Sequence, residues 1–266
     1  MKNLIEEFKY YLKNPSRDEI STVLIEELDL IEEYIINTKQ GSQKEESIYK
    51  KEIKMKYMDE EGVIQQIFGY QFVQNNINNI YLIINGNKSP LVQEYFLKEG
   101  ENDITLCIKN KLINLSNMFD YCKTLYNIDK LKYLNNEYVF YFSGMFQSSN
   151  ISNIKALKNW NTSKSETFRA MFYYYGFLTN IKPLKIWNVS RCKVFSEIFK
   201  GCPISNLKPL ESWNVPNAKN LKALFSGLKN IVDISPIQNW NGSNCENLSD
   251  LFSSCEKLSD ITPIEN

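Results

Sequence analysis

The stretch Trp187–Leu210, WNVSRCKVFSEIFKGCPISNLKPL, decides how the C-terminal half of the chain is interpreted, because most of its pattern recurs there. Its central phenylalanine has equivalents at steps of 27, 26, 27, 26 and 27 residues, which makes six copies of one unit. A regular period of this length indicates structural units that stack and share a core. The phenylalanines of this register are Phe119, Phe146, Phe172, Phe199, Phe225 and Phe252.

The first half of each unit has a helical pattern. Apolar residues such as Phe195, Ile198 and Phe199 fall at helical spacing, and Ser163 with Glu166 fits a capping box, whose side chains satisfy free backbone donors at a helix start. We therefore predict a short helix in every unit.

The second half of each unit has apolar residues in steps of three, as in Ile204, Leu207, Leu210 and Trp213. Neither a regular strand nor a regular helix has this period, so we predict an extended segment that bends round the core and contains a short strand. The predicted fold class is α/β: a solenoid of six coils over residues 112–266, with a short helix and a short parallel strand in each coil.

The unit from Trp187 to Leu210 resembles the repeat of BspA-like surface proteins, a leucine-rich-repeat type that occurs in protists and mycoplasmas. The stretch Ile67–Asn76 resembles the lead-in that precedes such repeats. The resemblance covers residues 62–266 and implies a leucine-rich-repeat-type solenoid used for adhesion or protein interaction. It implies no site residues, because the family has no shared catalytic set.

The first 111 residues predict two further regions. Apolar stripes on either side of Asn14-Pro15-Ser16 predict a helical hairpin over residues 1–40. Residues 41–111 predict a small α/β region that caps the first coil, because solenoids need terminal units with a polar outer face. In it, Asn85-Gly86 predicts a hairpin turn. The predicted strands are Ile53–Tyr57, Ile80–Ile84 and Ile104–Ile108.

Two polar positions recur with the period and would stack into columns. For the position after the tryptophan register we predict an inward ladder, whose side-chain amides bind backbone groups at a corner of the coil. Ligand binding is the alternative for both columns, and the regular spacing favours a structural role. The ladder residues are Asn135, Asn161, Asn188, Asn214 and Asn241, and the second column is Asn127, Asn153, Asn180, Asn206, Asp233 and Asp260.

Lysines recur at two positions of the unit, and stacking would join them into a basic column near the short strands. We interpret this column as a candidate binding site for an acidic partner. A solvated edge that suppresses aggregation is the alternative. The lysines are Lys132, Lys155, Lys158, Lys182, Lys185 and Lys208.

The side chains needed for common catalytic sites are missing from the sequence. Histidine is absent, which removes histidine-based triads, histidine metal sites and imidazole relays. Neither GxxxxGK[ST] nor GxGxxG occurs, so phosphate-binding glycine loops have no candidate. The six cysteines form no CxxC pair and follow the repeat, which favours free buried thiols over disulfides or zinc. We therefore predict no catalytic residue, cofactor or metal, and no enzyme activity.

Charge and hydropathy restrict the partners and the compartment. Lysine plus arginine equal aspartate plus glutamate, 31 against 31, so nucleic acid is not favoured. No signal peptide or membrane-spanning stretch is recognisable, and we expect a cytoplasmic protein rather than a cell-surface one. The last coil carries no cap, so either Leu258, Ile261 and Ile264 dock on a partner or the array continues.

Three functions follow as hypotheses. The first is a non-catalytic interaction or scaffold module that binds a protein partner through the solenoid surface and its C-terminal edge. The second, implied by the resemblance, is a cell-surface adhesin-like repeat protein. The third is an enzyme or nucleotide-binding subunit, which no motif supports.

Overall fold

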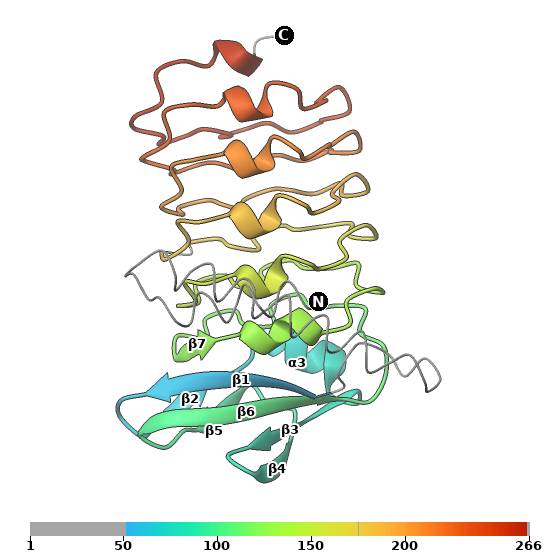
Figure 1. Cartoon of the computed structure of the whole chain (residues 1–266), viewed down its shortest axis with the longest axis vertical. Helices are drawn as coiled ribbons and strands as arrows, with labels where there is room; N and C mark the ends of the chain where they lie inside the picture. The colour runs from blue at the N-terminus through green and yellow to red at the C-terminus, as the bar shows by residue number, and fades with distance from the viewer. Residues whose placement is uncertain (1–51, 175, 265–266) are drawn as a thin grey trace, which may run out of the picture. The chain divides into compact units, whose positions relative to one another are not determined.

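The computed structural model describes residues 52–174 and 176–264 (Figure 1). The predicted helical hairpin of residues 1–40 lies outside the described residues. Within the described ranges, no helix combines the length and apolar composition needed to cross a bilayer.

The region before the repeats contains a five-stranded antiparallel sheet of order β4-β3-β6-β1-β7. Alternation places Ile53, Met55 and Tyr57 of β1 in the core, as a sheet with one buried face requires. The three predicted strands and the hairpin turn are confirmed. The strands are β1 (Glu52–Asp59), β3 (Ile80–Ile84), β4 (Asn87–Pro90), β6 (Gly100–Ile108) and β7 (Leu125–Asn127); β2 (Ile64–Gln66) pairs with β5 (Glu94–Phe96), and α3 (Tyr70–Asn76) lies between β2 and β3.

The predicted fold class is wrong. The sole α-helix among the described residues, α3, precedes the repeats, and the named strands pair in antiparallel fashion. Each repeat contains a 3-10 turn where the strand was predicted, and the segment predicted as a helix is not an α-helix, so the described residues do not form a helix-plus-parallel-strand solenoid. The turns define repeats 1 to 6: η1 (Asp129–Tyr133), η2 (Lys155–Leu157), η3 (Lys182–Leu184), η4 (Lys208–Leu210), η5 (Ser235–Ile237) and η6 (Thr262–Ile264).

The segment predicted as a helix makes a different set of backbone hydrogen bonds. Alternate N–H groups donate to the next repeat, as Phe119 does to the Met145 carbonyl at 2.8 Å, while others donate three residues back, as Met118 does to Leu115 at 3.1 Å. An α-helix needs every N–H to bond four residues back. Two residues in each repeat also have a left-handed backbone, which no regular right-handed helix tolerates. These are Asn117, Gly144, Ala170, Glu197, Ala223 and Asp250, and Tyr121, Ser148, Tyr174, Gly201, Gly227 and Ser254.

The second polar column explains why a 3-10 turn forms where a strand was predicted. The Asn180 side-chain oxygen accepts a hydrogen bond from the Lys182 N–H at 3.0 Å, which fixes the start of η3. Proline is buried at the second position of this turn, Pro183, where its fixed φ suits the turn and its missing N–H costs nothing. Equivalent bonds are made by Asn127, Asn153, Asn206, Asp233 and Asp260.

Aromatic rings form the centre of the repeat core. Phe172 stacks on Phe146 at 5.7 Å and on Phe199 at 6.0 Å between ring centroids, with an interplanar angle of 3° in both pairs. The register phenylalanines therefore lie face to face from repeat to repeat. The indole N–H of Trp187 adds a link, because it donates to the Leu157 carbonyl of the preceding repeat at 2.9 Å. Trp160, Trp213 and Trp240 make the same bond.

The region before the repeats packs directly on repeat 1. Phe68 extends the aromatic column to Phe119, at 5.9 Å between ring centroids, and the Gly69 N–H donates to the Met118 carbonyl at 3.2 Å. Strand β7 of repeat 1 pairs with β1. Repeat 1 is thus covered by the preceding region, and its own strand joins the sheet of that region.

Candidate functional site

The 3-10 turns form one side of the repeat stack, where they follow one another in a column (Figure 1). In η3 the residues before and at the end of the turn, Ile181 and Leu184, are buried, which leaves Lys182 and Lys185 exposed. The same alternation holds in the neighbouring repeats. We call this exposed surface the η face. It consists of the exposed residues of the turns, the Asn or Asp residue that caps each turn, and the residue that follows each turn.

The structure places all six predicted lysines in the 3-10 turns or directly after them, with Lys132 half-buried and the other five on the η face. Lys155, Lys182 and Lys208 begin η2, η3 and η4, Lys158 and Lys185 follow η2 and η3, and Lys132 lies in η1. The five in η2 to η4 are exposed. Lys208 forms an ion pair with Glu211 at 2.8 Å. In the described part of the chain no ion pair involves the four lysines of repeats 2 and 3: Lys155, Lys158, Lys182 and Lys185.

The charge of the η face changes sign along the stack. Repeats 2 and 3 present only lysines, repeat 4 presents both Lys208 and Glu211, and repeats 5 and 6 present Asp233 and Asp260. The hydrogen bond from the Ser235 N–H lowers the pKa of Asp233, and the bond from the Thr262 N–H lowers the pKa of Asp260. Both carboxylates are therefore charged at neutral pH. The sequence indicates the lysines but not this opposition, because the regular spacing of the caps indicates only a structural role.

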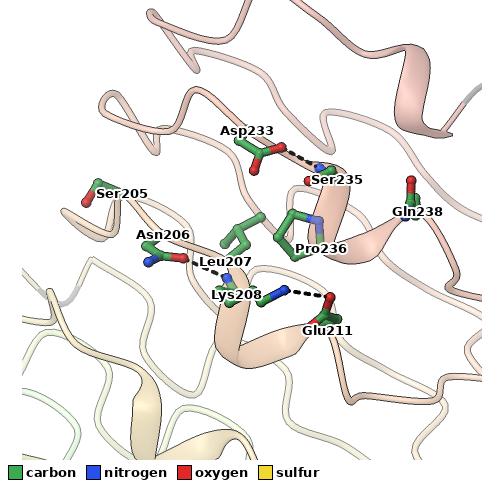
Figure 2. Close-up of a pocket in the computed structure, with 9 residues that line it drawn as sticks. All are labelled: Ser205, Asn206, Leu207, Lys208, Glu211, Asp233, Ser235, Pro236 and Gln238. Carbon is green, nitrogen blue, oxygen red and sulfur yellow. Dashed lines mark hydrogen bonds and ion pairs between the residues drawn. The ribbon is translucent and has the colours of Figure 1, made fainter.

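A polar pocket of about 330 Å³ lies between η4 and η5, at the point where the charge changes sign. Figure 2 shows Lys208 and Glu211 on one wall and Asp233, Ser235 and Gln238 on the other. Hydrogen-bond acceptors therefore face the pocket from both repeats. Glu211 is paired with Lys208, so a cationic side chain of a partner would find one carboxylate there without an ion pair among the described residues, that of Asp233.

The structure corrects the inward direction of the predicted asparagine ladder but not its bonds to backbone groups. Asn161, Asn188, Asn214 and Asn241 are exposed rather than inward, because the preceding tryptophan occupies the core. The Asn188 side-chain oxygen accepts the Ser190 N–H of its own repeat at 3.1 Å. Asn135, Asn161 and Asn241 make the same local bond, and Asn214 does not because proline stands two residues on.

A second polar hollow, also about 330 Å³, lies on the side of the repeats that carries the left-handed residues. Small residues, Gly144 and Ala170, line it together with Tyr173 and an ion pair between Arg169 and Glu197 at 3.7 Å. Glu197 also pairs with Lys200 at 3.7 Å. Because the charged groups here are already paired, this hollow offers less to a charged ligand than the η face does.

Asp120 is a partly buried carboxylate where repeat 1 meets the preceding region. One carboxylate oxygen, Oδ1, is buried without a hydrogen-bond partner, while the Asn117 amide donates to the other at 3.4 Å. Burial raises the pKa of Asp120 from 3.8 to about 6, and the hydrogen bond from Asn117 and the charge of Lys123 offset only part of this rise. The charged form therefore destabilises the fold at neutral pH.

Replacing Asp120 with asparagine should raise the thermal unfolding midpoint at pH 7.5. The folded-state pKa of Asp120 lies above its ordinary value. The contribution of this carboxyl group to the free energy of unfolding therefore falls as pH rises from about 4 through about 6. The advantage of Asp120→Asn should therefore be full above pH 6 and vanish near pH 4, measured by thermal melts of both proteins across this range. An equal advantage at pH 4 and pH 7.5 would show that charge is not its cause.

The cysteines are free and mostly buried, as predicted. Burial raises the pKa of Cys192 to about 12, which removes the thiolate needed for nucleophilic chemistry. Cys202 donates to the Phe172 carbonyl at 3.0 Å and so contributes to packing between repeats. Within the described residues, no group of three or more His, Cys, Asp or Glu side chains is placed to hold a metal ion.

The last described repeat has an exposed apolar edge. Ile261 is 51% exposed, whereas its equivalent in repeat 5, Ile234, is fully buried. Ile264 is exposed and Leu258 is half-buried. Partner binding at this edge stays a prediction.

Comparison with protein-family models gives a match. A family model described as "Mycoplasma protein of unknown function, DUF285" matches residues 92–206 and 174–265, which together span most of the chain. No curated protein and no solved structure matches significantly.

Proposed function

The chain belongs to the family described as Mycoplasma protein of unknown function, DUF285, and from that premise we propose that it is a non-catalytic protein-interaction module that binds an acidic protein surface through the η face. The observation that carries this proposal is the set of four exposed lysines in repeats 2 and 3 without an ion pair among the described residues. Like charges on adjacent repeats repel one another, and an acidic partner relieves that repulsion.

The turns present these lysines on a fixed backbone. Each turn is held at its start by an asparagine oxygen, as in the bond from the Lys155 N–H to Asn153 at 2.9 Å. In η3 the buried Pro183 stiffens the turn further. Binding therefore orders lysine side chains but no backbone, which lowers its entropic cost.

The resemblance of the repeats to those of BspA-like surface proteins supports an interaction role. It also supports a second candidate function, an adhesin-like protein at the cell surface. The exposure of Asn161, Asn188 and Asn241, all in N-x-S/T sequons, is compatible with that location. Protease treatment of intact cells distinguishes the two, because a surface adhesin is cleaved and an internal module is not.

Reversing three lysine charges should abolish salt-sensitive binding to an acidic peptide. We expect Lys158→Glu, Lys182→Glu and Lys185→Glu together to weaken binding of a fluorescent polyglutamate peptide by about tenfold or more, because attraction becomes repulsion. Fluorescence anisotropy at about 50 mM salt, well below physiological screening, gives the affinity. The protein should be dilute, so that only peptide binding is read.

A matched control changes the net charge equally at exposed lysines elsewhere: Lys98→Glu, Lys193→Glu and Lys222→Glu. This control should retain most of the affinity of the wild type. If both variants lose binding to the same extent, net charge rather than the η face determines it and the proposal fails.

A further inference from the structure

The η face carries complementary charges at its two ends. Its lysines gather in repeats 2 and 3, its unpaired carboxylates, Asp233 and Asp260, in repeats 5 and 6, and repeat 4 between them carries Lys208 and Glu211. Such a surface matches a copy of itself turned end for end. A two-fold interface has this property, because residue i contacts residue j and j contacts i.

We propose that the η face binds a second copy of this chain, with the two copies antiparallel about a two-fold axis through η4. This inference uses the surface of the proposed function and names its partner. The resulting interface is held by charge and is sensitive to salt.

The two-fold axis gives each repeat a defined opposite. Repeat 3 with Lys182 and Lys185 faces repeat 5 with Asp233, and repeat 2 with Lys155 and Lys158 faces repeat 6 with Asp260. Repeat 4 faces itself, so that Lys208 of each copy meets Glu211 of the other. A parallel arrangement would set lysine against lysine and is disfavoured by like-charge repulsion.

The pocket between η4 and η5 provides a place for the lysines of the second copy. Glu211 lies on one wall and Asp233 on the other, and the volume of about 330 Å³ is open to the η face (Figure 2). A lysine reaching in from repeat 3 of the second copy would meet Asp233, because Glu211 is engaged by Lys208. Ile186, beside Lys185, is 61% exposed, and the same contact would remove its apolar surface from water.

Two complementary variants test the arrangement. The acidic variant carries Lys155→Glu, Lys158→Glu, Lys182→Glu and Lys185→Glu, and the basic variant carries Asp233→Lys and Asp260→Lys. Each copy of a variant meets like charge on its twin, whereas an equimolar mixture restores opposite charges at every repeat. Thermal melts first establish that both variants fold.

Sedimentation equilibrium at about 50 mM salt measures association. We expect the wild type to shift from 31.2 kDa towards twice that mass with concentration, each variant alone to stay monomeric, and the mixture to associate. Association of the wild type should weaken by about tenfold or more at about 300 mM salt. The triple control with Lys98→Glu, Lys193→Glu and Lys222→Glu should associate like the wild type.

Three results would overturn the inference: a wild type that stays monomeric at low salt, a variant that associates alone, or a mixture that stays monomeric. Should either variant fail to fold, the salt series of the wild type and the other variant alone still decide. If polyglutamate binds but the chain does not self-associate, this inference fails and the proposed function stands. If the mixture associates but polyglutamate does not bind, recognition of a foreign acidic partner fails instead.

Discussion

Replacing Phe172 with alanine should lower the free energy of unfolding by about 3–5 kcal/mol, the range for removing a buried aromatic ring. The ring is fully buried and stacks on Phe146 and Phe199 in the two adjacent repeats. Its loss opens a cavity at two interfaces between repeats, and each repeat depends on contacts with its neighbours for stability. Urea unfolding followed by tryptophan fluorescence measures the change, since all four tryptophans lie in the repeats.

The matched control is Phe177→Ala, which removes the same ring from a position that is 53% exposed. We expect a change within about 0.5 kcal/mol, as for other surface substitutions. If Phe172→Ala changed stability as little as Phe177→Ala, the aromatic column would not be the core of the stack.

Replacing Gly69 with alanine should lower the free energy of unfolding by about 3 kcal/mol or more, because a side chain cannot fit between the cap and repeat 1. A Cβ atom at Gly69 would lie 2.0 Å from the Asn117 carbonyl oxygen and 3.2 Å from the Asp120 Cβ. The obstacle is the backbone of Asn117. It cannot move aside without breaking the hydrogen bond from the Gly69 N–H to the carbonyl of the adjacent Met118. Gly69 has φ of −71°, so alanine suits the backbone and the loss comes from the close approach alone.

Gly242→Ala is the matched control, since a Cβ atom there meets nothing within 4 Å. We expect it to be neutral or slightly stabilising, because alanine restricts the unfolded chain. Hydrogen exchange locates the effect of Gly69→Ala: amides of repeat 1, including Met118, should lose more protection than those of repeats 4 and 5. Uniform loss would show that the contact does not hold the cap on repeat 1.

The six-fold repeat and its inward residues could be predicted from the sequence, because burial sets a spacing that the sequence records directly. Phe195, Ile198 and Phe199 are buried as their spacing indicated. The secondary structure could not be predicted from the same spacing. A chain of turns and an α-helix both bring residues three and four apart to one side, so the apolar pattern does not tell them apart.

The candidate site was predicted in part. Lys155, Lys182 and Lys208 begin three successive turns, since equal positions of stacked repeats are neighbours, and their binding of a partner stays a prediction. The inward ladder through Asn188 was wrong because exposure at a corner depends on which neighbour, here Trp187, occupies the core. The acidic end of the η face was missed because Asp233 has a structural bond to Ser235 and still presents its charge.

The sequence by itself determined the period, the number of units and the residues of the core, since these follow from which side chains are apolar and become buried. Only the tertiary structure decided how the backbone of each unit is hydrogen-bonded. At Phe119 the N–H bonds to the Met145 carbonyl of the next repeat rather than to its own turn. This hydrogen bond can form only when the neighbouring repeat is in place, because an isolated segment does not contain the acceptor. The repeat at Trp187–Leu210 therefore specifies what is buried, and stacking specifies the conformation in which it is buried.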